Sequence, residues 1–307
     1  MTAYVLRRFV QSLVVLLGVA TVVFLLVRLT GDPVRIMLPP DATVAQEDAL
    51  RGQLGLDRSL VVQYFEYLGN LLRLDMGESL FFHQPVSSVI AERGPATLQL
   101  ALGAFVFALL VAIPAGIYSA LHRGRVSDSA VSALVLAGQS TPAFWVGILL
   151  ILIFPVQLNV LSAAGIGGIE HLILPSITLG LYTMAIIARM LRSSLIDVLD
   201  EDYIRTAKAK GLSGKAVVAA HGLRNAAPPV VTVIGLELGG LLGGAIVTEK
   251  VFAWPGLGRL TVDAIENRDF PLVQGVILLF AATFVVVNLL VDLCYAWLDP
   301  RIRLEAQ

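Results

Sequence analysis

The sequence predicts an all-α membrane protein with six transmembrane helices and a long outer segment after the first helix. The first observation behind this prediction is the composition: 57% of the 307 residues are hydrophobic and only 15% are charged, whereas a soluble domain carries about 25% charged residues. The second observation is a set of six apolar runs, each with the roughly 20 residues that a membrane helix needs. They lie at 10–29, 98–121, 130–157, 172–191, 230–251 and 272–298.

Charge and cysteine content narrow the class of protein. The formal net charge of −1 lacks the basic surplus that nucleic-acid binding uses, so we expect no nucleic-acid partner. The single cysteine, Cys294, lies in an apolar run and excludes an intrachain disulfide. The first apolar run follows Arg7 and Arg8 as in a signal peptide, but it continues to Leu29 without a small-residue cleavage site. We therefore expect a retained membrane helix.

The distribution of Lys and Arg predicts the orientation, because basic residues collect on the cytoplasmic side of membrane proteins. With the N-terminus in the cytoplasm, most basic residues near the membrane fall inside, and the outer loop 159–171 has no Lys or Arg. Six helices then place both termini in the cytoplasm. The chain divides into an N-terminal membrane helix (1–29), an outer helical segment (30–95) and a five-helix core (96–307), which includes a cytoplasmic loop (194–229).

Two short helices are expected in the outer segment. Thr43 and Gln46 form a capping-box pattern before a helix that Gly55 ends, and Ser59 caps a second helix. The second helix carries an apolar stripe at helical spacing, which favours packing on neighbouring helices over ligand binding. The stripe consists of Leu60, Tyr64, Leu68 and Leu71.

The third apolar run is interrupted by GQSTPAFW at 138–145. Its polar residues Gln139, Ser140 and Thr141 are costly against lipid, so we expect them inside the bundle or along a wet cavity. They are candidates for lining a pathway. Hydrogen bonding between helices explains them equally well, and the sequence leaves both readings open.

The fifth run carries glycine pairs four residues apart, which let two helix backbones approach closely. The pairs are Gly239 with Gly243 and Gly240 with Gly244. Glu237 lies well inside the same run, and a carboxylate at membrane depth indicates function by default. Glu237, Gly240 and Gly244 are therefore pathway candidates, although a structural role for Glu237, as a protonated or ion-paired group, stays open.

The last outer loop and the sixth run complete the core. Trp254, Pro255 and Gly256 predict a tight turn with an aromatic residue at the membrane interface. The sixth run contains Asn288 and Asp292. Asp292 lies nearer the cytoplasmic end, where we expect it to pair with a basic residue.

The cytoplasmic loop 194–229 has the most ordered pattern of charges in the chain. Acidic residues up to Asp202 precede basic residues that end at Lys210, and Gly211 follows them. This order complements a helix dipole and supplies a glycine at the C-terminal cap. The pattern predicts a short helix over 202–210 at the membrane surface.

The amino-acid sequence of this loop resembles that of a known family of proteins. DYIRTAKAKGL (202–212) followed by HGLRNAAPPVVT (221–232) is similar to the cytoplasmic coupling loop of ABC-importer permeases, in the variant typical of the dipeptide, oligopeptide, glutathione and nickel group. The outer phrases LGLDRSLVVQYFEYL and TEKVFAWPGLGRL and the ending DPRIR resemble the same group. The general family pattern is Glu-Ala-Ala, three residues and Gly. Only Ala207 and Gly211 match it here, so no role of the family's glutamate passes to Arg205.

The resemblance implies a type I ABC importer permease fold and a set of partners. These are a related second permease in a heterodimer, two ATP-binding subunits that hold ATP and Mg, and a periplasmic substrate-binding protein. The 202–211 helix would dock into a groove on an ATP-binding subunit. Its contact residues would be Asp202, Tyr203, Ile204, Arg205, Ala207, Lys208 and Gly211. The implied cargo is a dipeptide, an oligopeptide or glutathione, with nickel or another small solute as the alternative.

Catalytic patterns are missing from the sequence. Gly214 and Lys215 are followed by Ala216, so no phosphate-binding loop is present, and HExxH does not occur. We expect a non-catalytic subunit with no cofactor and no metal of its own. The rival classes are an intramembrane enzyme and a secondary transporter that works without ATP.

Overall fold

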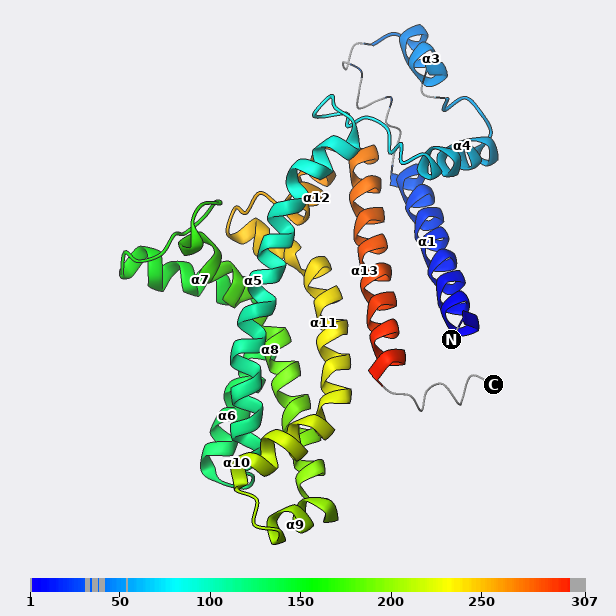
Figure 1. Ribbon diagram of the computed structural model, residues 1–307. Coiled ribbons are helices and arrows are strands. Elements are labelled where there is room, and N and C mark those ends of the chain that lie inside the picture. Colours follow the sequence, from blue (N-terminus) through cyan, green and yellow to red (C-terminus); the bar gives the residue numbers. More distant parts are fainter. Residues whose placement is uncertain (1, 31–33, 35–37, 39–41, 54, 299–307) are drawn as a thin grey trace.

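The computed structural model describes residues 2–30, 34, 38, 42–53 and 55–298. Within these residues every regular element is a helix, apart from one isolated β-bridge between Glu78 and Pro85. The predicted all-α class is therefore confirmed. Figure 1 shows a bundle of long helices with α3 and α4 at one end and α9 and α10 at the other. We call these ends the α4 end and the α9 end.

Five helical stretches are long and apolar enough to cross a membrane, and a bent pair makes a sixth. The five belong to α1 (Thr2–Thr30), α5 (Val86–Leu121), α8 (Ile169–Leu199), α11 (Arg224–Val251) with its preceding turns, and α13 (Phe270–Leu298). The expected boundary between 95 and 96 falls inside α5, because the polar residues before the apolar run already continue the same helix.

The third run forms no straight span. It consists of α6 (Val126–Ser140), α7 (Ala143–Ile151) and the π-helix η1 (Leu152–Gln157), and the two halves are bent by 101°. The bend lies at Thr141, whose backbone is extended, and Pro142. Proline lacks an N–H and disfavours helical geometry in the residue before it, so α6 ends here. Figure 1 shows α7 projecting sideways from the bundle.

Helix α8 lies at the centre of the core. In its most apolar window 61% of the residues are buried, against 17% in α1, so α1 is peripheral. Helix α5 packs on α8 almost backbone to backbone. A Cβ at Gly180 would lie 2.6 Å from the carbonyl oxygen of Ala104, and one at Gly116 would lie 2.9 Å from that of Ala188. We call this contact the α5–α8 seam.

The α4 end carries the two predicted outer helices, α3 (Val44–Gln53) and α4 (Leu60–Leu72). Ser59 caps α4 as expected, since its hydroxyl accepts a hydrogen bond from the Val62 N–H. Gly55 has a φ of +65° and ends the turn after α3.

The inward face of α4 differs from the predicted stripe. Leu60 is 58% exposed, whereas Gln63 is buried. Tyr64 and Tyr67 pack on Phe24 of α1, with ring centroids 5.4 Å apart in both pairs. Burial raises the pKa of Tyr67 to about 12. The helix therefore packs on α1 through Tyr64 of the predicted stripe, but its inward face is rotated away from Leu60 toward Gln63 and Tyr67.

The predicted last outer loop contains a helix, α12 (Leu257–Glu266), and its aromatic residue packs inside the protein. Trp254 is fully buried, and its Nε1 donates to the Ala96 carbonyl oxygen at 2.8 Å. Beneath it, the buried carboxylate of Glu249 accepts hydrogen bonds from the Thr97 hydroxyl (2.7 Å) and the Arg259 N–H (3.0 Å). The turn at 254–256 therefore packs Trp254 into the core beside this polar cluster.

Candidate functional site

The predicted short helix at the α9 end is present as α9 (Asp202–Ala209). Lys210 is its C-terminal cap, and Gly211 follows with a φ of +82°, a conformation that favours glycine. The Gly211 N–H donates to the Lys208 carbonyl (3.0 Å), and the Leu212 N–H donates to that of Ala207 (3.4 Å). These two bonds form a Schellman motif, which fixes where α9 ends.

The two faces of α9 have different roles. Ile204 and Ala207 are buried against Val217 and against Val198 and Leu199 at the end of α8. These two residues cannot belong to a free docking surface, which corrects the expectation from the sequence. Two apolar residues on one face of an eight-residue helix can pack against the same chain or against a partner protein, and the sequence pattern is the same in both cases.

The face of α9 directed away from the chain is polar. Tyr203 is 42% exposed, and the Arg205 guanidinium donates to the Asp202 carboxylate at 3.2 Å on the surface. The other expected contact residues on this side are exposed as well. They are Asp202, Arg205, Lys208 and Gly211.

An irregular segment packs against the buried face of α9. It consists of α10 (Gly214–Ala216) and the π-helix η2 (Val217–Leu223), which leads directly into α11. A Cβ at Gly222 would lie 3.1 Å from Leu195 of α8, so η2 packs closely on α8. Short π-helical stretches occur frequently at functional sites. Helix α9 thus packs against both the end of α8 and η2.

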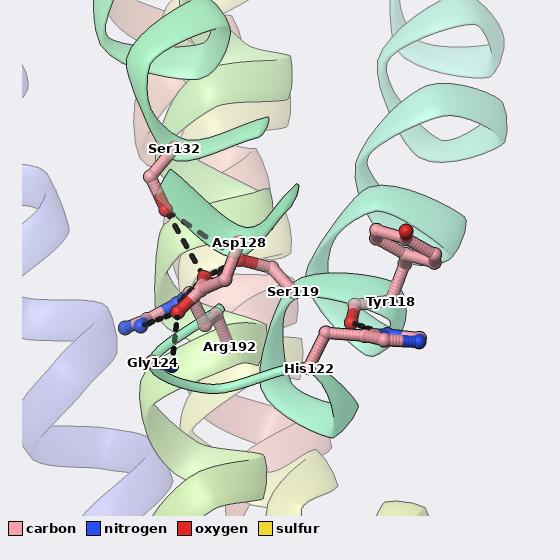
Figure 2. Close-up of polar contacts among 7 residues, drawn as sticks. All are labelled: Tyr118, Ser119, His122, Gly124, Asp128, Ser132 and Arg192. Atoms are coloured by element: carbon pink, nitrogen blue, oxygen red, sulfur yellow. Dashed lines mark hydrogen bonds and ion pairs between the residues drawn. The ribbon is translucent and has the colours of Figure 1, made fainter. Parts of the chain in front are cut away.

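A polar cluster near the α9 end joins α5, α6 and α8 (Figure 2). The sequence did not predict this cluster. Arg192 of α8 forms a bidentate ion pair with Asp128 of α6. Its Nε donates to Oδ1 at 2.8 Å and its Nη2 donates to Oδ2 at 2.8 Å. Asp128 is only 4% exposed. The pair is drawn inward because a buried carboxylate needs a partner.

Further donors complete the shell of the Asp128 carboxylate. The Ser119 hydroxyl of α5 donates to Oδ1 and accepts from the Arg192 Nε at 3.0 Å. The Gly124 N–H donates to Oδ2 at 3.1 Å, and the Ser132 hydroxyl reaches Oδ1 at 3.4 Å. We call these five residues the clamp. Asp128 and Arg192 are 64 residues apart in the sequence, so no local sequence pattern could predict the clamp.

The pathway candidates border α8 from two sides. Gln139 and Thr141 are half-buried and Ser140 is exposed, while the Thr141 hydroxyl donates to the Ala137 carbonyl at 2.6 Å. On the other side, the Thr183 hydroxyl of α8 donates to the half-buried Glu237 carboxylate at 3.0 Å.

The structure describes the surroundings of three of the four paired glycines of α11, namely Gly239, Gly240 and Gly243. A Cβ at Gly239 would lie 3.4 Å from the ring of Phe284 in α13, an ordinary contact distance, and one at Gly240 or Gly243 would meet nothing within 4 Å. The surroundings of Gly244, the side chain of Asp292 and the ending DPRIR lie outside the described residues. A Cβ at Gly235 would instead overlap the side chain of Val291, so the close contact of α11 with α13 lies at Gly235 and not at Gly239, Gly240 or Gly243.

The family follows from comparisons that cover the whole chain. Residues 112–304 match the family described as binding-protein-dependent transport system inner membrane component, and residues 1–101 match the N-terminal family of the same components. The chain belongs to this family. The permease is thus a membrane subunit of an ABC importer.

Relatives and solved structures agree with this family. The permease is 46% identical over 304 residues to the glutathione transport system permease protein GsiC of Escherichia coli (strain K12), which covers 99% of both chains. It is 47% identical to the protein of that name from Salmonella typhi over the same length and coverage. A structure of the MetNI methionine ABC transporter in an inward-facing conformation is similar with a TM-score of 0.55 and 20% identity, over 69% of the permease and 97% of that chain. An amino acid ABC transporter with histidines gives a TM-score of 0.53 and 16% identity, over 68% and 94% of the two chains.

These comparisons confirm several predictions. The permease has the type I importer fold, is a multi-pass inner-membrane protein of an importer that depends on a binding protein and on ATPase subunits, and is a non-catalytic subunit.

Proposed function

We propose that the permease carries glutathione or a small peptide across the inner membrane as one half of a heterodimer with a related permease. Support for this cargo comes from the full-length relatives, which are named glutathione transport permeases. The pathway candidates Gln139, Ser140, Thr141, Glu237 and Gly240 are small or polar, which suits a hydrophilic cargo. Nickel or another small solute is the alternative.

The ATP-driven step acts through α9. The observation that carries this proposal is the division of α9 into a buried apolar face and an exposed polar face. Ile204 and Ala207 anchor the helix to its own chain, so its motion is passed to α8. Tyr203, Arg205 and Lys208 then face the ATP-binding subunit, with Asp202 and Gly211 beside them. ATP and Mg are held by that partner.

A charge-reversal experiment tests this assignment. In Arg205→Glu/Lys208→Glu, the exposed face becomes acidic while the buried face is untouched, so we expect the amount of co-purified ATPase subunit to fall at least tenfold. Lys215→Glu is the matched control, because Lys215 is exposed on the neighbouring α10. Normal ATPase recovery with the double variant contradicts the role of α9.

The cargo is tested separately with the importer in proteoliposomes. We expect ATP-dependent uptake of labelled glutathione or dipeptide in the presence of the cognate binding protein, and competition by the unlabelled compound. Nickel uptake that neither compound reduces would favour the alternative.

A further inference from the structure

We propose that Asp128 and Arg192 are positioning residues that carry the displacement of α9 into α6. This inference rests on the proposed function, because it takes α9 as the contact of the ATP-binding subunit. The clamp then connects this contact to the pathway candidates at the far end of α6.

The first step is the attachment of α9 to α8. Only Asp200 and Glu201 separate the two helices, and Ile204 packs on Val198 and Leu199 at the end of α8. Because interiors are close-packed and barely compressible, a displacement of α9 moves this end of α8 as well. Arg192 lies in the same last part of α8, so it moves with it.

The second step is the transfer from α8 to α6. A bidentate guanidinium–carboxylate pair fixes direction as well as distance, because two parallel hydrogen bonds resist rotation. Asp128 lies in the first turn of α6 and is also held by the Gly124 N–H just before that helix. A second link, from Arg123 to Asp200 at 2.7 Å, joins the same turn to the residues before α9. Since both of its side chains are exposed, water and salt weaken it. The pair formed by the buried Asp128 and the half-buried Arg192 is therefore the stronger link.

The third step runs along α6 itself. The helix is continuous from Val126 to Ser140, so Asp128 and Gln139 lie at opposite ends of one rigid rod. The break at Thr141 and Pro142 separates this rod from α7. Helix α6 can therefore shift at Gln139 without displacing α7, which places the motion at the pathway candidates.

Stability alone does not explain the clamp. Apolar contacts among Ala108, Val135, Met184 and Ala188 already join α5, α6 and α8. Apolar residues of similar size often hold a buried site as well as an ion pair does. What the ion pair adds is a directional tie between two helices at the end where α9 is attached.

The test compares transport per ATP hydrolysed in the assembled importer, with the cognate binding protein and its cargo. We expect Asp128→Asn and Arg192→Gln to lower this ratio at least tenfold. Arg192→Lys keeps the charge but loses the parallel hydrogen bonds, so it should restore part of the ratio. Arg189→Gln is the matched control, because Arg189 is an exposed arginine one turn earlier on α8; its ratio should equal that of the wild type.

The double variant Asp128→Asn/Arg192→Gln keeps the test decisive if the single variants do not assemble, because it leaves no unpaired buried charge. Assembly with a lowered ratio supports the positioning role. A wild-type ratio in the double variant, or an equal loss in Arg189→Gln, overturns it. If the wild-type importer shows no ATP-dependent uptake, the proposed function fails instead, which separates the two results.

Discussion

Burial of single side chains decides which parts of α9 can meet a partner. Ala207 matches the family pattern, yet it is 7% exposed and packs on its own chain. The pattern alone could not distinguish an internal anchor from an external contact, because both require a small apolar residue. Glu249 and Trp254 show the same limit, since their partners Thr97 and Ala96 are more than a hundred residues away.

Ala207→Asp tests the anchoring role. A carboxylate placed against Val217 has no partner, and burying an unpaired polar group costs on the order of 2 kcal/mol or more. We expect α9 to detach and binding-protein-stimulated ATP hydrolysis to be lost, while the permease still assembles in the membrane. Ala220→Asp is the control, because Ala220 is exposed on η2 and lies outside α9, and it should retain stimulation. Normal stimulation in Ala207→Asp contradicts the anchor.

The ends of several helices could be predicted from capping and proline residues in the sequence. The caps of α4 and α9 and the break after α6 depend on Ser59, Gly211 and Pro142, whose effects act within a few residues. Helix α12 was missed because its short amphipathic run follows a turn and lies between two apolar spans. The 101° angle between α6 and α7 could not be predicted either, since proline ends a helix without setting the direction of the next one.

The α5–α8 seam offers a test with a matched pair of glycines. Gly180→Ala would place a Cβ 2.6 Å from the Ala104 carbonyl oxygen, so the helices must separate. Overpacking of this kind costs about 1–3 kcal/mol, and the melting temperature of the detergent-solubilised permease should fall. Gly69→Ala in α4 meets nothing within 4 Å and should raise the melting temperature slightly, since alanine favours a helix by about 1 kcal/mol. Equal effects at both positions would argue against a close seam.

The arrangement of the complete chain has a direct consequence for labelling. Leu60 on α4 and Lys208 on α9 are both exposed and lie at opposite ends of the bundle (Figure 1). With Cys294→Ser as background, we expect an impermeant maleimide to label Leu60→Cys in intact spheroplasts. Lys208→Cys should react only after permeabilisation. The reverse result contradicts cytoplasmic termini and a cytoplasmic α9.

Backbone contact along the seam also limits how this permease can alternate its access. The two helices touch where Gly180 of α8 meets Ala104 and where Gly116 of α5 meets Ala188, about two turns apart along α8. Two such close contacts prevent the helices from sliding past each other. We expect α5 and α8 to move together as one rigid body when the permease changes between its outward-facing and inward-facing states. The surfaces that open and close must then lie elsewhere, at the contact with the proposed second permease and at the Gln139 end of α6.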